Sequence, residues 1–303
     1  MDSKQFAMQV GRRADLKATQ EYDTKMIVSG STLEVYKLSS SQRRGYEMEL
    51  TDEKRQKRSF AELSPQEKLE SIKRKKKNLK QKRVDVMRLI STNFHPGLTK
   101  FVTLTFREHV TDRAEAMKEF KNFMKRLNYR QRAKNRPDIK YLGVIEYTKI
   151  GRIHFHVVLF NCAYIPKNEL ADVWGNGYVK INNIKGMDGS AVARYVTKYM
   201  VKQFEKMDDD LTKLFILGEE TEKQKDYFTS TNLKRPSVYY MRLGADELPS
   251  LTEQGELIDV KDYKRQKYVG KDEYGDPIFI EEEVIYIRYG LDQTKKLGQK
   301  VAS

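Results

Sequence analysis

The chain has 303 residues, enough to bury one large core or two of ordinary size. Its 58 Lys and Arg residues against 43 Asp and Glu give a net charge of +15, which favours polyanionic partners, nucleic acid first. A membrane surface is disfavoured because the densest charge run lacks the bulky apolar residues that an interfacial helix would bury. The only cysteine is Cys162 and no apolar run approaches the roughly 20 residues that cross a bilayer, so disulfides, cysteine-rich zinc clusters and membrane spans are excluded and a cytoplasmic protein is expected.

The first part of the chain, to about residue 98, is polar and strongly charged. Residues 25–36 have a strand-like pattern interrupted by a Gly-Ser turn signal, which predicts a hairpin. Ser64 followed by Glu67 has the spacing of a capping box, so a long helix is predicted from Ser64 to about Leu89.

A basic run lies within this predicted helix, since eight of the eleven residues from Lys73 to Arg83 are Lys or Arg. The run can hold phosphates along a nucleic-acid strand, or it can be a solvated helix face or a disordered basic segment. The residues that we expect to contact DNA here are Lys73, Arg74, Lys75, Lys76, Lys77, Lys80, Lys82 and Arg83.

Hydrophobic patterning concentrates between residues 99 and 206. The predicted strands are 101–106, 141–148, 153–160 and 178–184, and the predicted helices are 114–129, 166–174 and one that begins at Ser190. The order strand, helix, strand, strand, helix, strand, helix indicates an α+β fold, with a central, mostly antiparallel sheet flanked by helices.

Three segments follow from the whole pattern. They are a basic N-terminal accessory region (1–98), a core (99–206) and a C-terminal extension (207–303). In the extension we predict a helix at 211–217, short strands at 227–229 and 237–241, and a final hairpin whose strands, 263–269 and 278–288, flank a turn cluster. No Gly-rich phosphate loop with Gly-Lys-Ser/Thr is present, so nothing indicates an NTPase module.

The most informative segment holds two histidines two residues apart in a predicted strand. Residues two apart on a strand share a face, so the rings of His154 and His156 can reach one metal ion. The alternative is that both are ordinary polar residues of a half-buried strand. His95 and His109 lack such a pattern and are interpreted as structural or surface residues.

Glu146 is the expected third ligand. If residues 149–151 form a three-residue hairpin loop that ends in left-handed Gly151, then Glu146 lies opposite His154 and on its face. A loop of two or four residues would put the carboxylate on the other face. Two imidazoles and a carboxylate leave coordination positions open for a phosphoryl oxygen and suit Mn²⁺ or Mg²⁺, although Zn²⁺ also accepts such ligands.

Two tyrosines follow at helical spacing. Tyr195 and Tyr199 share a helix side with Lys198 and Lys202, each lysine three residues after its tyrosine. A phenol is a weak nucleophile at neutral pH and needs a nearby cation or metal to stabilise the phenolate as it forms. The alternative is a core-facing stripe that includes both tyrosines, because Val192, Val196 and Met200 continue the same pattern.

The strand 101–106, the His154-Phe155-His156 segment and the Tyr195–Lys202 segment resemble, in order and spacing, the three motifs of HUH-type rolling-circle replication initiators, closest to the two-tyrosine kind of bacteriophages and plasmids. The resemblance covers residues 99 to 206. It implies an HUH endonuclease core, which is a ferredoxin-like or RRM-like fold. It also implies His154 and His156 as metal ligands, Tyr195 and Tyr199 as nucleophiles followed by Lys198 and Lys202, and, less securely, Glu146 as an acidic ligand.

The function implied is metal-dependent nicking and rejoining of single-stranded or hairpin origin DNA through a 5′-phosphotyrosine, in the cytoplasm of a bacterial or phage-infected cell. A host helicase and polymerase are the expected partners, and Arg152 and Arg194, beside the motifs, are expected to contact DNA. Two rivals remain: a transposase or mobilisation relaxase of the same chemistry, and a non-enzymatic basic protein whose sheet stacks bases on Tyr and Phe.

Overall fold

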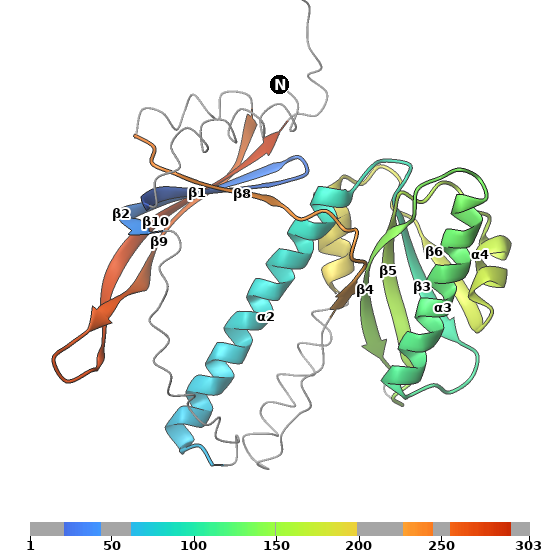
Figure 1. Cartoon of the computed structure of the whole chain (residues 1–303), viewed down its shortest axis with the longest axis horizontal. Helices are drawn as coiled ribbons and strands as arrows, with labels where there is room; N and C mark the ends of the chain where they lie inside the picture. Colours follow the sequence, from blue (N-terminus) through green and yellow to red (C-terminus); the bar gives the residue numbers. More distant parts are fainter. Residues whose placement is uncertain (1–20, 44–61, 149, 199–226, 245–254, 292–303) are drawn as a thin grey trace, which may run out of the picture. The chain divides into compact units, whose positions relative to one another are not determined.

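The computed structural model describes residues 21–43, 62–148, 150–198, 227–244 and 255–291 (Figure 1). The chain divides into two compact units, which we call the terminal unit (Met1–Lys54 with Arg235–Ser303) and the central unit (Arg55–Lys234). In the described residues no helix is both long and apolar enough to cross a membrane.

The central unit is built on a five-stranded antiparallel sheet of order β6-β3-β5-β4-β7. The strands are β3 (Lys100–Phe106), β4 (Lys140–Tyr147), β5 (Ile153–Phe160), β6 (Gly177–Asn182) and β7 (Tyr227–Thr229). Each was predicted within a few residues, because alternating apolar side chains mark these segments. The predicted α+β class is confirmed.

One face of this sheet is covered by α3 (Arg113–Arg132) and α4 (Lys167–Trp174). Asp112 caps α3 by accepting hydrogen bonds from the first-turn amides, and Gly175 ends α4 in the left-handed conformation, with φ of 71°. Phe120, Phe155 and Trp174 are fully buried between helices and sheet. The odd-numbered side chains of β5 are buried in this layer, so its even-numbered side chains lie on the other face of the sheet.

The opposite face packs against the last turns of α2 (Pro65–Asn93) and the helical residues 189–198. The predicted capping box is confirmed: Ser64 accepts from the Glu67 amide at 3.3 Å, and the Glu67 carboxylate accepts from the Ser64 amide at 2.9 Å. Val86, Leu89 and Ile90 of α2 are buried. Its preceding turns are largely exposed, so the helix is attached through one end (Figure 1).

The terminal unit is a second antiparallel sheet, of order β8-β1-β2-β10-β9. Its strands are β1 (Glu21–Ser29), β2 (Thr32–Arg43), β8 (Ser237–Met241), β9 (Gly255–Lys271) and β10 (Pro277–Leu291). Both predicted hairpins are present, and both are longer than expected. Met26, Leu33, Val35 and Met241 form a small core on one face.

The two hairpins belong to one sheet because β2 pairs with β10, from Leu38 opposite Val284 to Thr32 opposite Gly290. The compact units therefore divide the chain differently from the predicted segments 1–98, 99–206 and 207–303. The long helix α2 lies in the central unit, and the N-terminal hairpin lies with the C-terminal one. Pairing between strands over 200 residues apart leaves no trace in local sequence pattern. The predicted helix at 211–217 lies outside the described residues.

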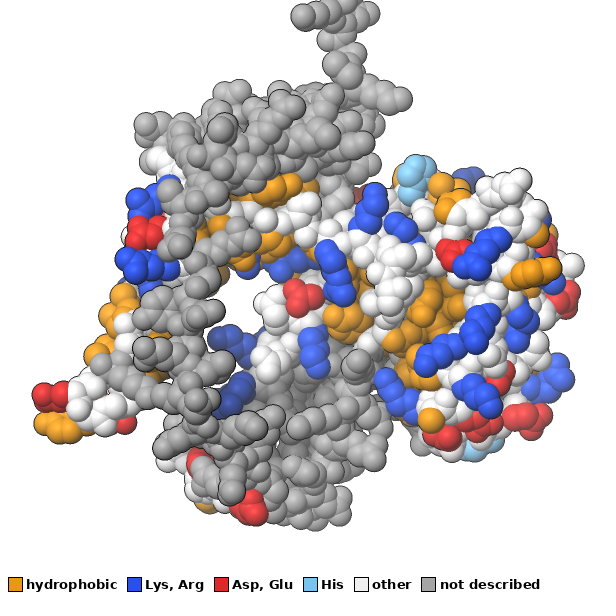
Figure 2. Space-filling model, in the orientation of Figure 1, with side chains coloured by type: hydrophobic (Ala, Val, Ile, Leu, Met, Phe, Trp, Pro, Cys, Tyr) orange, Lys and Arg blue, Asp and Glu red, His pale blue; other side chains and the backbone are white. Residues whose placement is uncertain are grey.

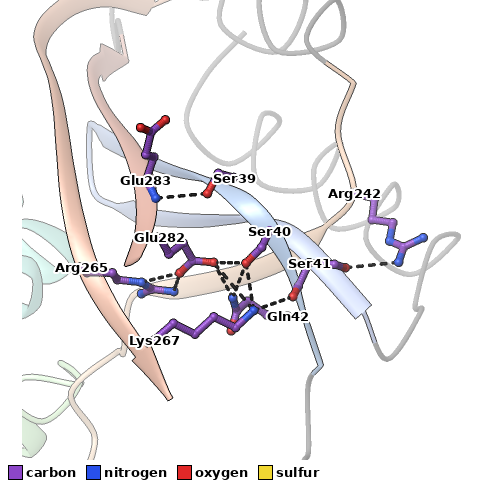
Figure 3. A network of polar contacts seen from close by, with 9 residues as sticks. All are labelled: Ser39, Ser40, Ser41, Gln42, Arg242, Arg265, Lys267, Glu282 and Glu283. Carbon is purple, nitrogen blue, oxygen red and sulfur yellow. Dashed lines mark hydrogen bonds and ion pairs between the residues drawn. The ribbon is translucent and has the colours of Figure 1, made fainter. Parts of the chain in front are cut away.

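A buried glutamate ties the long hairpin to β2 (Figure 3). The Glu282 side chain is 0% exposed; it forms an ion pair with Arg265 at 2.6 Å and accepts hydrogen bonds from Gln42 at 2.7 Å and from Ser40. Burial by itself raises the pKa of Glu282, but the hydrogen bonds from Ser40 and Arg265 outweigh it and hold this pKa below its ordinary value.

We expect Glu282→Ala to lower the free energy of unfolding of the terminal unit by about 2–3 kcal/mol, because it strips buried donors of their acceptor. Urea unfolding followed by circular dichroism measures this. The matched control is Glu283→Ala, which removes an exposed carboxylate from the next position and should change little. Equal losses in the two variants would contradict a special role for the buried group.

Candidate active site

The β4–β5 hairpin sets the geometry of the predicted site. Thr148 and Arg152 close the loop, with the Thr148 amide donating to the Arg152 carbonyl at 2.9 Å, and Gly151 has a left-handed φ of 81°. The register predicted from this loop length is confirmed, because Glu146 pairs with His154. Both therefore lie on the face that carries His156, while Ile153 and its alternate neighbours fill the core under α3.

A chain of hydrogen bonds holds the inner histidine. His156 is 4% exposed; its Nε2 lies 2.5 Å from Glu146 Oε2 and its Nδ1 lies 3.2 Å from Thr103 Oγ1. Thr103 in turn accepts from the Asn182 side-chain amide at 3.2 Å, and Asn182 also donates to the Phe101 carbonyl at 3.4 Å. The ring is thus held at both nitrogens by groups from two other strands, and Asn182 on a third strand supports one of these groups.

The face that carries the site changes from apolar to polar along its strands. At one end Phe101, Val158 and Leu142 pair side by side and are buried under the helices. Four residues further along β3, the row of paired residues across four strands consists of polar side chains. That row is Tyr178, Thr105, His154 and Glu146. Between the two lies a row that contains Lys180, Thr103 and His156.

The outer histidine is half-buried and lies among charged groups. Burial is the main cause that lowers the pKa of His154; Glu146 raises it, while His156 and Arg152 lower it further. A neutral imidazole keeps a lone pair free to bind a cation. Arg152 Nε is buried and has no hydrogen-bond partner among the described residues, which leaves its guanidinium a donor for an anion.

The first predicted nucleophile lies where the apolar and polar ends meet. Tyr195 is half-buried, and its ring packs edge-on against Phe101 at 5.4 Å between centroids. The same Phe101 ring lies 6.3 Å from the His156 ring. Lys198 Nζ lies 5.9 Å from the Tyr195 ring centroid, within one helical turn as predicted. The core-packing interpretation thus applies in part, since the ring contacts the apolar cluster. Tyr199 and Lys202 lie outside the described residues.

The predicted DNA-contacting residues outside this face divide into two groups. Arg194 is exposed on the tyrosine helix. In α2 the basic run is helical, which removes the disordered alternative, and the exposed members are Lys73, Arg74, Lys77, Lys80, Lys82 and Arg83. The backbone of Lys75 and Lys76 continues the helix. His95 and His109 are at the surface, as expected.

The donor set fits a divalent cation in chemistry but not yet in spacing. Two ligand atoms that each lie about 2.1 Å from one ion, at right angles to each other, are about 3 Å apart. This separation is roughly half an ångström longer than the distance between Glu146 Oε2 and His156 Nε2. In the described part of the chain, no group of three or more His, Cys, Asp or Glu side chains is already arranged to hold a metal. A cation bound to both groups would have to take the place of the direct hydrogen bond between Glu146 and His156.

Sequence reasoning missed Asn182, Tyr178 and Lys180, all on β6. Their strand was predicted, but these residues form no recognisable sequence motif. Only the pairing of β6 with β3 places them beside Thr103 and Thr105. A neighbouring-strand position of this kind has no local signal.

The pKa shift of His154 predicts a pH dependence. Because the folded pKa lies below the ordinary value of about 6.5, the neutral ring stabilises the fold above pH 6.5, and this contribution is lost as the pH falls through the folded pKa. We expect the free energy of unfolding, measured with urea in the presence of a chelator, to decrease less steeply for His154→Gln than for the wild type as the pH is lowered from about 7 to 5. The exposed control His109→Gln should keep the wild-type slope; parallel curves for all three proteins would contradict the prediction.

Residues 99–204 match the family model for the ORF2 type of replication-associated protein. A similar relative is Uncharacterized protein 1 of Halorubrum pleomorphic virus 1, which is 29% identical over 113 residues. This match covers 31% of the chain and 23% of the viral protein, so the chain matches about a quarter of that relative's length. No solved structure matches the chain. Over residues 99–204, about a third of the chain, the sequence is therefore similar to this family of replication-associated proteins.

Proposed function

We propose that the chain initiates rolling-circle replication by nicking and rejoining single-stranded DNA at an origin through a 5′-phosphotyrosine. The observation that carries this proposal is the convergence on one sheet face of Glu146, His154 and His156, with Tyr195 packed against Phe101 beside His156. The family match at residues 99–204 supports a role in replication initiation in general.

The three ligands would hold Mn²⁺ or Mg²⁺. When bound, the ion supplies Lewis-acid polarisation of the scissile phosphate. The protein's own part is to keep the ligands aimed. Thr103 and Asn182 fix the His156 ring, and the tight hairpin fixes Glu146 opposite His154. Arg152, with its buried unpaired Nε, would contact a phosphate oxygen from the same face.

A tyrosine then attacks the phosphorus atom. The phenol oxygen forms a bond to phosphorus as its proton leaves, and the bond from phosphorus to the 3′ oxygen breaks, so that this oxygen takes up a proton as a free 3′ hydroxyl. One phosphodiester replaces another, and rejoining therefore needs no ATP. Lys198, close to the Tyr195 ring, would favour the phenolate. We assign the second round of attack to Tyr199, with Lys202 in the corresponding role.

The basic turns of α2 and Arg194 would hold the DNA through phosphate contacts that depend on salt and not on sequence. Single-stranded or hairpin origin DNA is the proposed substrate, and a host helicase and polymerase would complete the replication machinery. A transposase or relaxase would share this chemistry and differ in the DNA site that it cuts.

A non-enzymatic nucleic-acid-binding protein is the second candidate. Two observations favour it: Glu146 and His156 are in direct contact, without room for an ion between them, and Tyr195 is partly packed into the core. Cleavage of an end-labelled single-stranded oligonucleotide with Mn²⁺, leaving protein joined to the 5′ end, separates the candidates.

For the nucleophiles, we expect Tyr195→Phe and Tyr199→Phe each to retain part of the nicking activity and the double variant to lose on the order of a thousandfold or more. The readout is the covalent protein–DNA adduct on a denaturing gel. Tyr129→Phe, which alters an exposed phenol on α3, is the matched control. Full nicking by the double variant would exclude both tyrosines as nucleophiles.

For the ligand geometry, Thr103→Val should weaken Mn²⁺ binding by roughly 10- to 100-fold, because it removes the hydroxyl that orients His156 without changing side-chain shape. Calorimetric titration of the DNA-free protein with Mn²⁺ measures this. Thr103→Ser restores the hydroxyl and should bind nearly as wild type. If Val and Ser variants bind Mn²⁺ equally, the hydroxyl does not orient the ligand.

A further inference from the structure

The β6 edge of the central sheet presents an aromatic and a basic side chain to solvent. Tyr178 on β6 is 70% exposed, although it pairs with half-buried Thr105, whose other neighbour is His154. Lys180 is exposed two residues further along, opposite Thr103. Strand alternation places both side chains on the face of His154 and His156, since Val179 between them packs into the core under α3.

We propose that Tyr178 and Lys180 form a subsite for single-stranded DNA beside the scissile phosphate, in which Tyr178 stacks on a base and Lys180 pairs with a backbone phosphate. This inference rests on the proposed function and adds the position of the DNA strand on the protein. One strand, β3, lies between Tyr178 and His154, so the two residues are two strand spacings, or about 10 Å, apart, and the stacked base belongs close to the cleaved bond.

The position of Tyr178 is fixed by its surroundings. A Cβ at Gly177, whose φ is 150°, would lie 2.4 Å from the Thr105 carbonyl oxygen, so only glycine allows this close approach of β6 to β3. Trp174 Nε1 donates to the same carbonyl at 3.1 Å, and the Arg107 amide donates to the Asn176 carbonyl at 2.8 Å. These contacts hold the backbone that carries the exposed ring, so little backbone freedom is lost when a base stacks on it.

Charge alone does not distinguish this face. Lys and Arg side chains are also spread over the side of the central unit that carries α3, where exposed Lys121, Lys125 and Tyr129 lie on the far side of the sheet from the histidines (Figure 2). What separates the β6 subsite is its alignment in one polar row with the proposed metal ligands. The α3 residues therefore supply matched controls.

The test uses the full chain, a chelator and fluorescein-labelled oligothymidylate, with affinity measured by fluorescence anisotropy. Tyr178→Ala should weaken binding roughly 5- to 100-fold, the range for one lost stacked base, and Tyr178→Phe should bind almost as wild type. Tyr129→Ala, which removes an equally exposed ring from α3, should have no effect. Lys180→Gln should reduce the slope of log affinity against log salt by about 0.7, and Lys121→Gln should leave it unchanged.

The proposal is overturned if Tyr178→Ala binds as tightly as wild type, or if Tyr129→Ala loses as much affinity as Tyr178→Ala. Because the assay needs no cleavage, failure of the subsite can be distinguished from failure of the proposed function. A chain that never cuts DNA but loses binding in Tyr178→Ala has the subsite without the nuclease, whereas a chain that nicks normally and binds normally in Tyr178→Ala is a nuclease without this subsite.

Discussion

The register between β4 and β5 is the constraint on which the site depends. A three-residue loop ending in left-handed Gly151 places Glu146 opposite His154. A slip of one residue would turn Glu146 toward the apolar layer under α3, where Phe155 and its neighbours are fully buried and a carboxylate would have no partner. The same core that stabilises the hairpin therefore also aligns its polar side chains, so folding and site assembly are enforced by one set of contacts.

The division of that sheet face accounts for the position of the proposed nucleophile on a helix beside the proposed ligands on the strands. Helical residues 189–198 need an apolar surface to pack on, and the proposed chemistry needs polar groups open to a substrate. Phe101 satisfies both needs, since it is buried, contacts the Tyr195 ring and lies near His156. Packing thereby limits how far the phenol can move from the ligands, which lowers the entropic cost of bringing nucleophile and phosphate together.

Most of the central sheet and its site could be predicted from sequence because their signals are local. Strand alternation, the capping box at Ser64 and the loop glycine each act within a few residues, and together they place Glu146, His154 and His156 on one face. The joining of β2 to β10 could not be predicted, since it connects segments over 200 residues apart whose pairing depends on the whole sheet. The division into units follows from that pairing, so it was beyond local reasoning too.

The same limit applies to Tyr178, Lys180 and Asn182. An aromatic or basic residue in a strand has no distinguishing pattern, and its meaning comes from the strand beside it. Antiparallel pairing of β6 with β3 makes Asn182 a support for Thr103 and places Tyr178 and Lys180 where the proposed DNA subsite needs them. In the proposed arrangement, changes at Tyr178 and Lys180 can alter which DNA is bound while both histidines on β5 stay in place, whereas a change at Asn182 would reach His156 through Thr103.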